Sequence, residues 1–315
     1  MARHHPAKAM AARAATTSTV LDLAMAQDAS MDAIEAAEAA LIALRGQPPD
    51  MAGAVTTALG DATGGMAPDS TVHRAALAVA QAVERHGASF PRGAEPAYHD
   101  RLHQAETARA MGWLAGAARR MGLLTREEAA LAVLAMAAHD LGHDGQVHAE
   151  RGVLERRSAE DAGAIATAAG LPPADIAALR RIVLATTWPW EDQEAPDLSC
   201  RLAREADLFA SSLPRLGPLL SRLLARELAA AGQPAPEGVA THAARVALLR
   251  LLPPASPPAR ALGLDAARSA QLAAYAGAAR RLGLPGTSAE EGAAALDALD
   301  PADAEALLAW SGEVR

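Results

Sequence analysis

Two short histidine-containing segments hold the residues of this chain that are best suited to chemistry. One is YHDRLH at residues 98–103, and the other is HDLGH at residues 139–143. Histidines four apart project from one face of a helix, so each segment would present two imidazoles side by side. Two such helices in contact can close imidazole and carboxylate groups around a metal ion. The sequence therefore predicts a metal site that joins the two segments.

The ligands expected from these segments are His103, His139 and Asp140, because imidazole nitrogens and carboxylate oxygens bind divalent transition ions. Asp140 directly follows His139, so its carboxylate could bridge two ions. A fourth ligand must come from elsewhere, and Asp207 is a carboxylate in an otherwise apolar helical stretch. An unpaired charge there is costly, and coordination would remove that cost. A helix cap or an ion pair would also satisfy Asp207, so both interpretations stay open.

The composition of the 315 residues favours a helical protein. Hydrophobic residues make up 51% of the chain but aromatic residues only 3%, so Ala, Leu and Val carry the apolar content. Ala and Leu are strong helix formers, whereas β-branched and aromatic residues favour strands. We therefore predict an all-α fold. The spacing of apolar residues predicts helices at 20–44, 71–86, 99–121, 127–141, 151–169, 173–186, 198–209, 216–232, 242–252, 265–282 and 289–310, the last one interrupted at Asp300-Pro301.

The local composition along the chain predicts its domain organisation. Residues 1–20 resemble a tail, and residues 61–69 are rich in Gly, Asp and Pro, which favours a linker. We expect an N-terminal tail and helical extension at 1–70, followed by the main domain at 71–315. Within that domain the motifs fill residues 98–214, and further helices follow at 215–315.

Charge and cysteine content exclude several classes of protein. The net charge is −8 and no run of Lys or Arg indicates a nucleic-acid or membrane surface. No apolar run has the length of a membrane span. The single cysteine, Cys200, excludes an intramolecular disulfide and suits the cytoplasm, where we expect the protein.

The order H…HD…D is the signature of the HD superfamily of metal-dependent phosphohydrolases. Within that superfamily, the two histidine segments, VLE at 153–155, AT at 185–186 and ADL at 206–208 resemble the catalytic domain of class I cyclic-nucleotide phosphodiesterases. The resemblance covers residues 98–214 and implies a multi-helix HD-domain bundle. The chain departs from the family pattern at Asp100, Asp144, residues 156–158 and Thr187. None of these positions is an expected metal ligand, so the expected ligand set is complete.

The resemblance implies a role for each matching residue. The first ion, Zn, Mn or Fe, would be held by His103, His139, Asp140 and Asp207. Asp140 would also bridge to a second ion, Mg or Mn, held mainly by water. His99 would be the general acid that protonates the leaving O3′. The residues expected around the ligands are His143, Glu155 and Thr186.

The expected base pocket matches the family less closely. The family recognises its purine with a Gln and clamps it with a Phe in a late helix. Gln271, followed by Tyr275, is the nearest match, although an ordinary amphipathic helix explains this stretch better. Trp188 and Trp190 are an alternative stacking surface, and core packing would account for them equally well.

The function implied by the resemblance is hydrolysis of a 3′,5′-cyclic nucleotide (cAMP or cGMP), or a related phosphodiester, to a 5′-phosphate by metal-activated hydroxide. The expected partner is a small-molecule nucleotide, with no nucleic-acid duplex and no membrane, and a homodimer is an open alternative. An HD-type nucleotide phosphomonoesterase or a catalytically silent metal- or ligand-binding module would share the same ligands. A mixed-valent di-iron oxygenase would need two more histidines, and only His143 and His148 are available.

Overall fold

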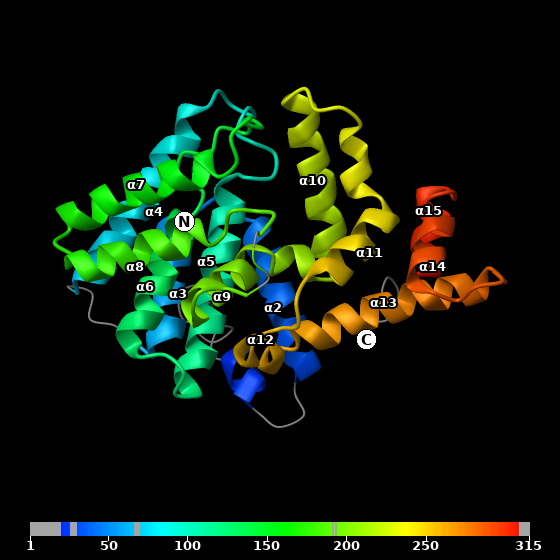
Figure 1. Ribbon diagram of the computed structural model, residues 1–315, viewed down its shortest axis with the longest axis horizontal. Helices are drawn as coiled ribbons and strands as arrows, with labels where there is room; N and C mark the ends of the chain where they lie inside the picture. The colour runs from blue at the N-terminus through cyan, green and yellow to red at the C-terminus, as the bar shows by residue number, and fades with distance from the viewer. Residues whose placement is uncertain (1–19, 26–29, 66–69, 191, 193, 309–315) are drawn as a thin grey trace, which may run out of the picture.

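A computed structural model describes residues 20–25, 30–65, 70–190, 192 and 194–308 of the chain. Every regular element in these residues is helical and none is a strand, which confirms the all-α prediction (Figure 1). A short helical stretch at residues 20–25 precedes the longer elements. These are α2 (Ser30–Arg45), α3 (Met51–Thr63), α4 (Thr71–Ser89), α5 (Arg101–Arg120), α6 (Arg126–Ala138), α7 (Val153–Ala168), α8 (Pro173–Leu184), α9 (Leu198–Asp207), the 3-10 turn η1 (Ala210–Ser212), α10 (Leu216–Ala230), the 3-10 turn η2 (Pro236–Ala240), α11 (His242–Leu251), α12 (Pro257–Ala261), α13 (Leu264–Arg281), α14 (Ala289–Leu296) and α15 (Pro301–Leu307).

Helix α6 lies at the centre of the bundle. Its ten residues from 129 to 138 are all buried, as its apolar sequence on every face requires. It packs against α3, α4, α5, α8 and α9. The helix begins with a capping box, in which Thr125 accepts a hydrogen bond from the Glu128 backbone and the Glu128 carboxylate accepts one from the Thr125 backbone. The C-terminal end of this central helix, with His139 as its C-cap, therefore lies in the interior of the protein.

Helix α3 was not predicted from the sequence. Residues 61–63, expected to start a linker, are the last turn of this helix, so that part of the linker prediction is wrong; residues 66–69 lie outside the described part of the chain. Asp50 caps the helix by accepting a hydrogen bond from Gly53 N at 2.9 Å. One face of the helix, including Val55 and Leu59, is fully buried. Because this short helix contains several Gly and Thr residues, the spacing of its apolar residues does not indicate the buried face.

The N-terminal helices share one hydrophobic core with the main domain. Helix α3 lies so close to α5 that a Cβ on Gly112 would be 2.7 Å from the Cα of Ala58. Nearby, Arg109 of α5 donates a hydrogen bond to Asp61 of α3 at 3.0 Å, and both side chains are more than nine-tenths buried. The expected boundary at residue 70 therefore does not separate two cores. The predicted tail at residues 1–20 lies outside the described residues, except for Val20, which is helical and buried.

The C-terminal helices form a smaller cluster beside the main bundle. Parts of α11, α13, α14 and α15 pack around Val246 and Tyr275, at the yellow-to-red end of the chain in Figure 1. The predicted interruption at Asp300-Pro301 is confirmed, because Asp300 caps α15 and Pro301 occupies its first turn. The predicted end of this segment, at residue 310, lies outside the described residues. None of the helices in the described residues combines the length and hydropathy needed to cross a bilayer.

Candidate metal centre

Three helix ends bring the four expected ligands together. His103 lies in the first turn of α5, His139 is the C-cap of α6 and is followed by Asp140, and Asp207 is the last residue of α9. Helices α5, α6 and α9 all pack against one another. Residues separated by more than a hundred positions in the sequence therefore meet at a single point.

The distances between the ligand atoms suit one shared ion. Nε2 of His139 lies 3.0 Å from Oδ2 of Asp140, and Nε2 of His103 lies 3.4 Å from the same oxygen. Both Nε2 atoms are 3.4 Å from Oδ1 of Asp207. Donors at ~2.1 Å from a common ion are ~3.4 Å apart in a tetrahedron and ~3.0 Å apart in an octahedron. The ligand atoms of His103, His139 and Asp140 all lie within 4.8 Å of one another, close enough to share an ion, and Asp207 faces both imidazoles.

The hydrogen-bonding state of the imidazoles supports the same interpretation. Nδ1 of His139 donates a hydrogen bond to the carbonyl of Met136 at 2.9 Å, so its Nε2 is the nitrogen that faces the carboxylates. The Nε2 atoms of His139 and His103 are buried and have no hydrogen-bond partner among the described residues. Buried polar atoms are normally satisfied, so two such atoms aimed at one point indicate a missing ligand. A divalent cation at that point would satisfy both.

The electrostatics of the four groups are strongly coupled. Burial acts to lower the pKa of His103, but the facing Asp140 and Asp207 outweigh it and raise the pKa to about 9. The pKa of His139 is raised well above its ordinary value for the same reason. Burial would raise the pKa of both carboxyl groups, but the imidazoles hold that of Asp207 at about 2 and that of Asp140 well below its ordinary value. The imidazoles and the carboxylates therefore stabilise one another's charged forms.

The expectation that each histidine pair shares one helix face is wrong. Helix α5 begins only at Arg101, because Asp100 is its N-cap and accepts a hydrogen bond from His103 N at 2.8 Å. His99 therefore precedes the helix, and His143 lies in the turn beyond the end of α6. The two side chains still meet, with their rings stacked at a centroid distance of 3.9 Å. Chain turns at the helix ends, rather than helical periodicity, place them together.

His99 is held by the carboxylate of Glu227, which the sequence motifs did not indicate. Nδ1 of His99 donates to Oε1 of Glu227 at 2.6 Å, and Oε2 of Glu227 accepts hydrogen bonds from the backbone N–H groups of Tyr98 and His99 at 2.8 and 2.9 Å. Burial would raise the pKa of Glu227, but these bonds and the nearby imidazole lower it to about 2. Glu227 is thus an ionised acceptor that fixes the His99 ring, with Nε2 as the remaining nitrogen.

A pattern in α10 could have identified Glu227. The buried residues of this helix are Leu216, Gly217, Leu220 and Glu227, so the glutamate lies on the apolar face. A buried carboxylate requires a partner, and that requirement is a signal visible in the sequence. The partner itself is not visible, because His99 is 128 positions away.

His143 lies beside His99 in a neutral form. Its Nδ1 accepts a hydrogen bond from Gly145 N at 3.1 Å, and its carbonyl accepts one from Nε2 of His86 at 2.9 Å. Burial and the neighbouring His99 lower its pKa to about 4. The atoms of His99, His143 and Glu227 also lie within 4.8 Å of one another, close enough for a second cation. Since both Nδ1 atoms are already used, we interpret this group as a hydrogen-bonded support for His99.

Two further expected residues occupy different positions. Glu155, in the first turn of α7, is partly buried, and desolvation followed by the charges of Asp140 and Asp207 raises its pKa. It therefore lies within electrostatic range of the ligand carboxylates. Thr186 is buried and donates its hydroxyl to the carbonyl of Val183 at 2.8 Å. The described contacts place Thr186 in the turn after α8 and show no direct contact with a ligand.

Gln271, the nearest match to a purine-reading residue, is engaged within the fold. It is 1% exposed, its Nε2 donates to the carbonyl of Ser212 at 2.8 Å, and its Oε1 accepts hydrogen bonds from Arg245. Tyr275 is fully buried as well, and its hydroxyl lies 3.1 Å from Nδ1 of His242. These polar groups already have partners, so the structure gives them a packing role. Trp188 is 39% exposed and meets Trp190 edge to face.

No protein-family model matches this chain, and no curated protein matches its sequence.

Proposed function

We propose that the protein is a metal-dependent phosphodiesterase, and that the four helix-end ligands are its catalytic centre. The observation that carries the proposal is the pair of buried Nε2 atoms, on His103 and His139, which face two carboxylates without a hydrogen-bond partner among the described residues. His99, held by Glu227 next to this centre, adds a proton donor. A cation site can activate water for hydrolysis of a phosphate ester, and an oriented imidazole beside it can protonate the leaving group.

The four ligands would hold the first ion, and Asp140 would share a second ion with water. A divalent ion at this position supplies Lewis-acid activation of water and neutralises charge on phosphate oxygens. The net charge of the chain is −8, so its overall field repels a phosphodiester. Attraction of the substrate must therefore be local, and the centre is where that local positive charge would be.

His99 would supply the proton to the leaving oxygen. Because its Nδ1–H is committed to Glu227, the exchangeable proton resides on Nε2. Glu227 prevents the ring from turning, as a buried carboxylate does for a catalytic imidazole. The ring of His143 packs flat against His99 and limits its movement further. A cyclic nucleotide, whose leaving group is an alkoxide, is the kind of substrate that benefits from such a donor.

The test is an activity screen of the full chain. The protein is stripped with chelator, reloaded with Mn²⁺, Mg²⁺ or Zn²⁺, and assayed against cAMP, cGMP, linear dinucleotides, nucleoside monophosphates and bis(p-nitrophenyl) phosphate. We expect metal-dependent release of a 5′-phosphate product from a phosphodiester. Turnover of the monophosphates alone would replace the proposal with a phosphomonoesterase. Metal binding with no turnover of any ester would indicate a silent binding module.

A further inference from the structure

A cavity of ≈ 590 Å³ lies along helix α9, apart from the metal centre. Arg201, Arg204, Glu205 and Leu208 line it and share one side of α9, because they are three or four residues apart. No expected metal ligand lines the cavity, although Asp207 is three residues from Arg204 and therefore only about 60° away from it around the helix. The opposite walls of the cavity are Trp190, residues 252–254, and Arg268 from α13.

Three arginines face this cavity and are held mainly by backbone carbonyls. Arg201 donates to the carbonyl of Pro254 at 2.7 Å, and Arg268 donates to that of Pro253 at 2.9 Å. Arg204 donates from Nη1 to the carbonyl of Asp192 at 2.9 Å and from Nε to that of Ala185 at 3.1 Å. A carbonyl fixes a guanidinium in position but leaves its full charge in place. The cavity therefore has a fixed positive wall.

The acidic groups of the cavity are largely committed to other partners. Glu205 is saturated by Ser256, whose N and Oγ both donate to it at 2.6 Å; Arg201 lies 3.7 Å away. Asp197 caps α9 and pairs with Arg181 at 2.8 Å. Glu194 is exposed to solvent. Asp197 is paired with Arg181, and the bonds from Ser256 leave the charge of Glu205 in place, so Glu205 and Glu194 offset part of the charge of the three lining arginines.

Arg268 has a buried donor to spare. Its side chain is 9% exposed, and its Nε has no hydrogen-bond partner among the described residues. Its nearest carboxylate oxygen, on Asp265, is 3.8 Å from Nη1, which is beyond hydrogen-bonding distance. Burial accordingly lowers the pKa of Arg268, although its charge persists at neutral pH. The Nε atom itself has almost no accessible surface, so Arg268 presents its positive charge to the cavity through the rest of the guanidinium, which can attract an anion there.

The rest of the lining suits a flat apolar body. The guanidinium of Arg204 lies 5.1 Å from the ring centroid of Trp190, which holds the indole in place. Leu208, Leu252 and the prolines at 253–254 complete the apolar surface. A volume of this size is typical of small-molecule sites, which combine apolar walls with a few polar groups.

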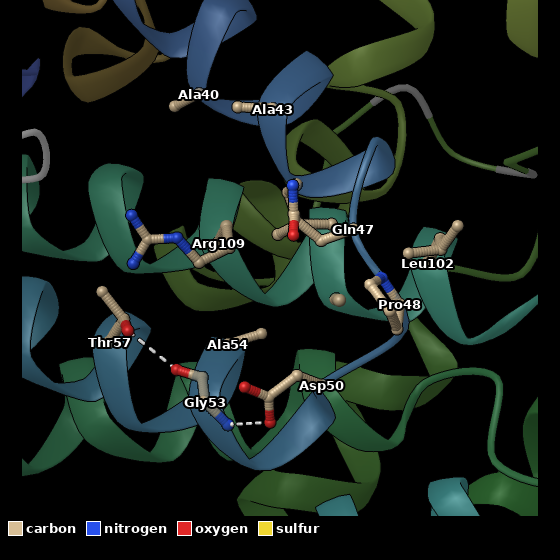
Figure 2. Close-up of a pocket in the computed structure, with 12 residues that line it drawn as sticks. Ala40, Ala43, Gln47, Pro48, Asp50, Gly53, Ala54, Thr57, Leu102 and Arg109 are labelled. Atoms are coloured by element: carbon tan, nitrogen blue, oxygen red, sulfur yellow. Dashed lines mark hydrogen bonds between the residues drawn. The ribbon is translucent and has the colours of Figure 1, made fainter. Parts of the chain in front are cut away.

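A second pocket of the molecule lacks these features (Figure 2). It measures ≈ 400 Å³ and lies between α2, which carries Ala40 and Ala43, and α3, which carries Ala54 and Thr57. Its arginine, Arg109 of α5, is already paired with the buried carboxylate of Asp61 at 3.0 Å. This pocket therefore has no comparable demand for an anion, and it provides an internal control.

We propose that the α9 cavity binds a small aromatic anion, with its carboxylate, sulfonate or phosphate group at Arg268 and Arg204 and its ring against Trp190. A bidentate guanidinium contact recognises all three of these anionic groups. The proposal is independent of the phosphodiesterase proposal, since it uses none of the metal ligands.

Fluorescence titration of the full chain with 1-anilinonaphthalene-8-sulfonate tests this proposal. N-phenyl-1-naphthylamine, a neutral probe with the same rings, is titrated in parallel. We expect one saturable sulfonate site, weakened about tenfold in Arg268→Gln and in Arg204→Gln, with the neutral probe changed less than about twofold. Arg250→Gln, at an exposed arginine on α11 outside the cavity lining, is the matched control and should change neither titration.

Circular dichroism checks that each variant is folded. If Arg268→Gln is unfolded, the titration of Arg204→Gln decides the outcome. Ala43→Phe places a large side chain in the lining of the other pocket and should leave sulfonate binding intact. The proposal is overturned if the sulfonate shows no saturable site. It is overturned equally if the arginine variants bind the sulfonate as the natural chain does, or if Ala43→Phe removes the binding.

Discussion

Metal binding at the helix-end centre should release two protons per ion at neutral pH. An imidazole binds metal only when the coordinating nitrogen is deprotonated. Since the pKa of His103 is raised to about 9 and that of His139 well above its ordinary value, both rings carry a proton at pH 7 in the metal-free protein. Asp207, with a pKa of about 2, and Asp140, whose pKa is lower than usual, are already ionised and release none.

The size of the effect follows from that count. A raised pKa means that protons compete with metal throughout the range below it, so the affinity for metal must rise with pH. With two protons released, the apparent association constant increases by two log units per pH unit, about a hundredfold or ~2.7 kcal/mol. The slope should persist across neutral pH and decrease as pH approaches 9, where His103 loses its proton without metal.

Isothermal titration calorimetry with Mn²⁺ measures both quantities. Chelator-stripped protein is titrated at several pH values, each in two buffers with different ionisation enthalpies, which gives the proton count directly. His103→Ala should release one proton fewer, whereas His148→Ala, at a partly exposed histidine outside the centre, should behave as the natural chain. A pH-independent affinity in the natural chain would show that the imidazoles are neutral without metal and would refute the electrostatic reasoning.

Three further predictions concern single substitutions. Asp140→Ala should abolish metal binding and turnover, whereas His99→Ala should retain metal, measured by mass spectrometry, and lose about 10²–10⁴-fold in kcat; normal activity in either variant contradicts the assignment. Glu227→Gln keeps an acceptor but removes the charge that orients His99, so kcat should fall about 10–100-fold with metal content unchanged; an unchanged kcat would exclude an orienting role. Gly112→Ala should destabilise the fold by about 1–3 kcal/mol, because its Cβ would lie 2.7 Å from the α3 backbone. Gly60→Ala, where a Cβ meets nothing within 4 Å, is the matched control in thermal unfolding, and equal melting temperatures for the two variants would refute the close-packing argument.

Local sequence patterns were sufficient to predict the elements that hold the ligands. Helix α6 is apolar on every face, and the capping box at Thr125 marks its start, so both its existence and its central position could be predicted. The same patterns did not reveal α3, whose buried face depends on close contact with Gly112 of α5. That contact is a property of two helices together, and a reading of either sequence alone does not contain it.

The metal ligands could be predicted from the sequence, whereas Glu227, which holds His99, could not. The pattern of His and Asp residues around His103, His139 and Asp140 is specific, because few functions other than metal binding require these residue types at such short spacings. Glu227 becomes meaningful only when α10 approaches the start of α5, where its carboxylate meets His99 and two backbone N–H groups. A charged residue on the apolar face of a helix indicates that it has a partner in the folded protein. Identifying the partner requires the tertiary structure.

The use of helix ends has an electrostatic consequence of its own. His139 and Asp140 follow the C-terminus of α6, and Asp207 ends α9, so two negative helix-dipole ends meet at the centre. Each can favour a cation by about 0.3–1 kcal/mol. The opposing positive end of α5 is capped by the Asp100 carboxylate. The backbone therefore adds to the attraction that the carboxylates exert on a cation. Because the two C-termini meet only when α6 and α9 pack against α5, a bound ion would stabilise that packing as well.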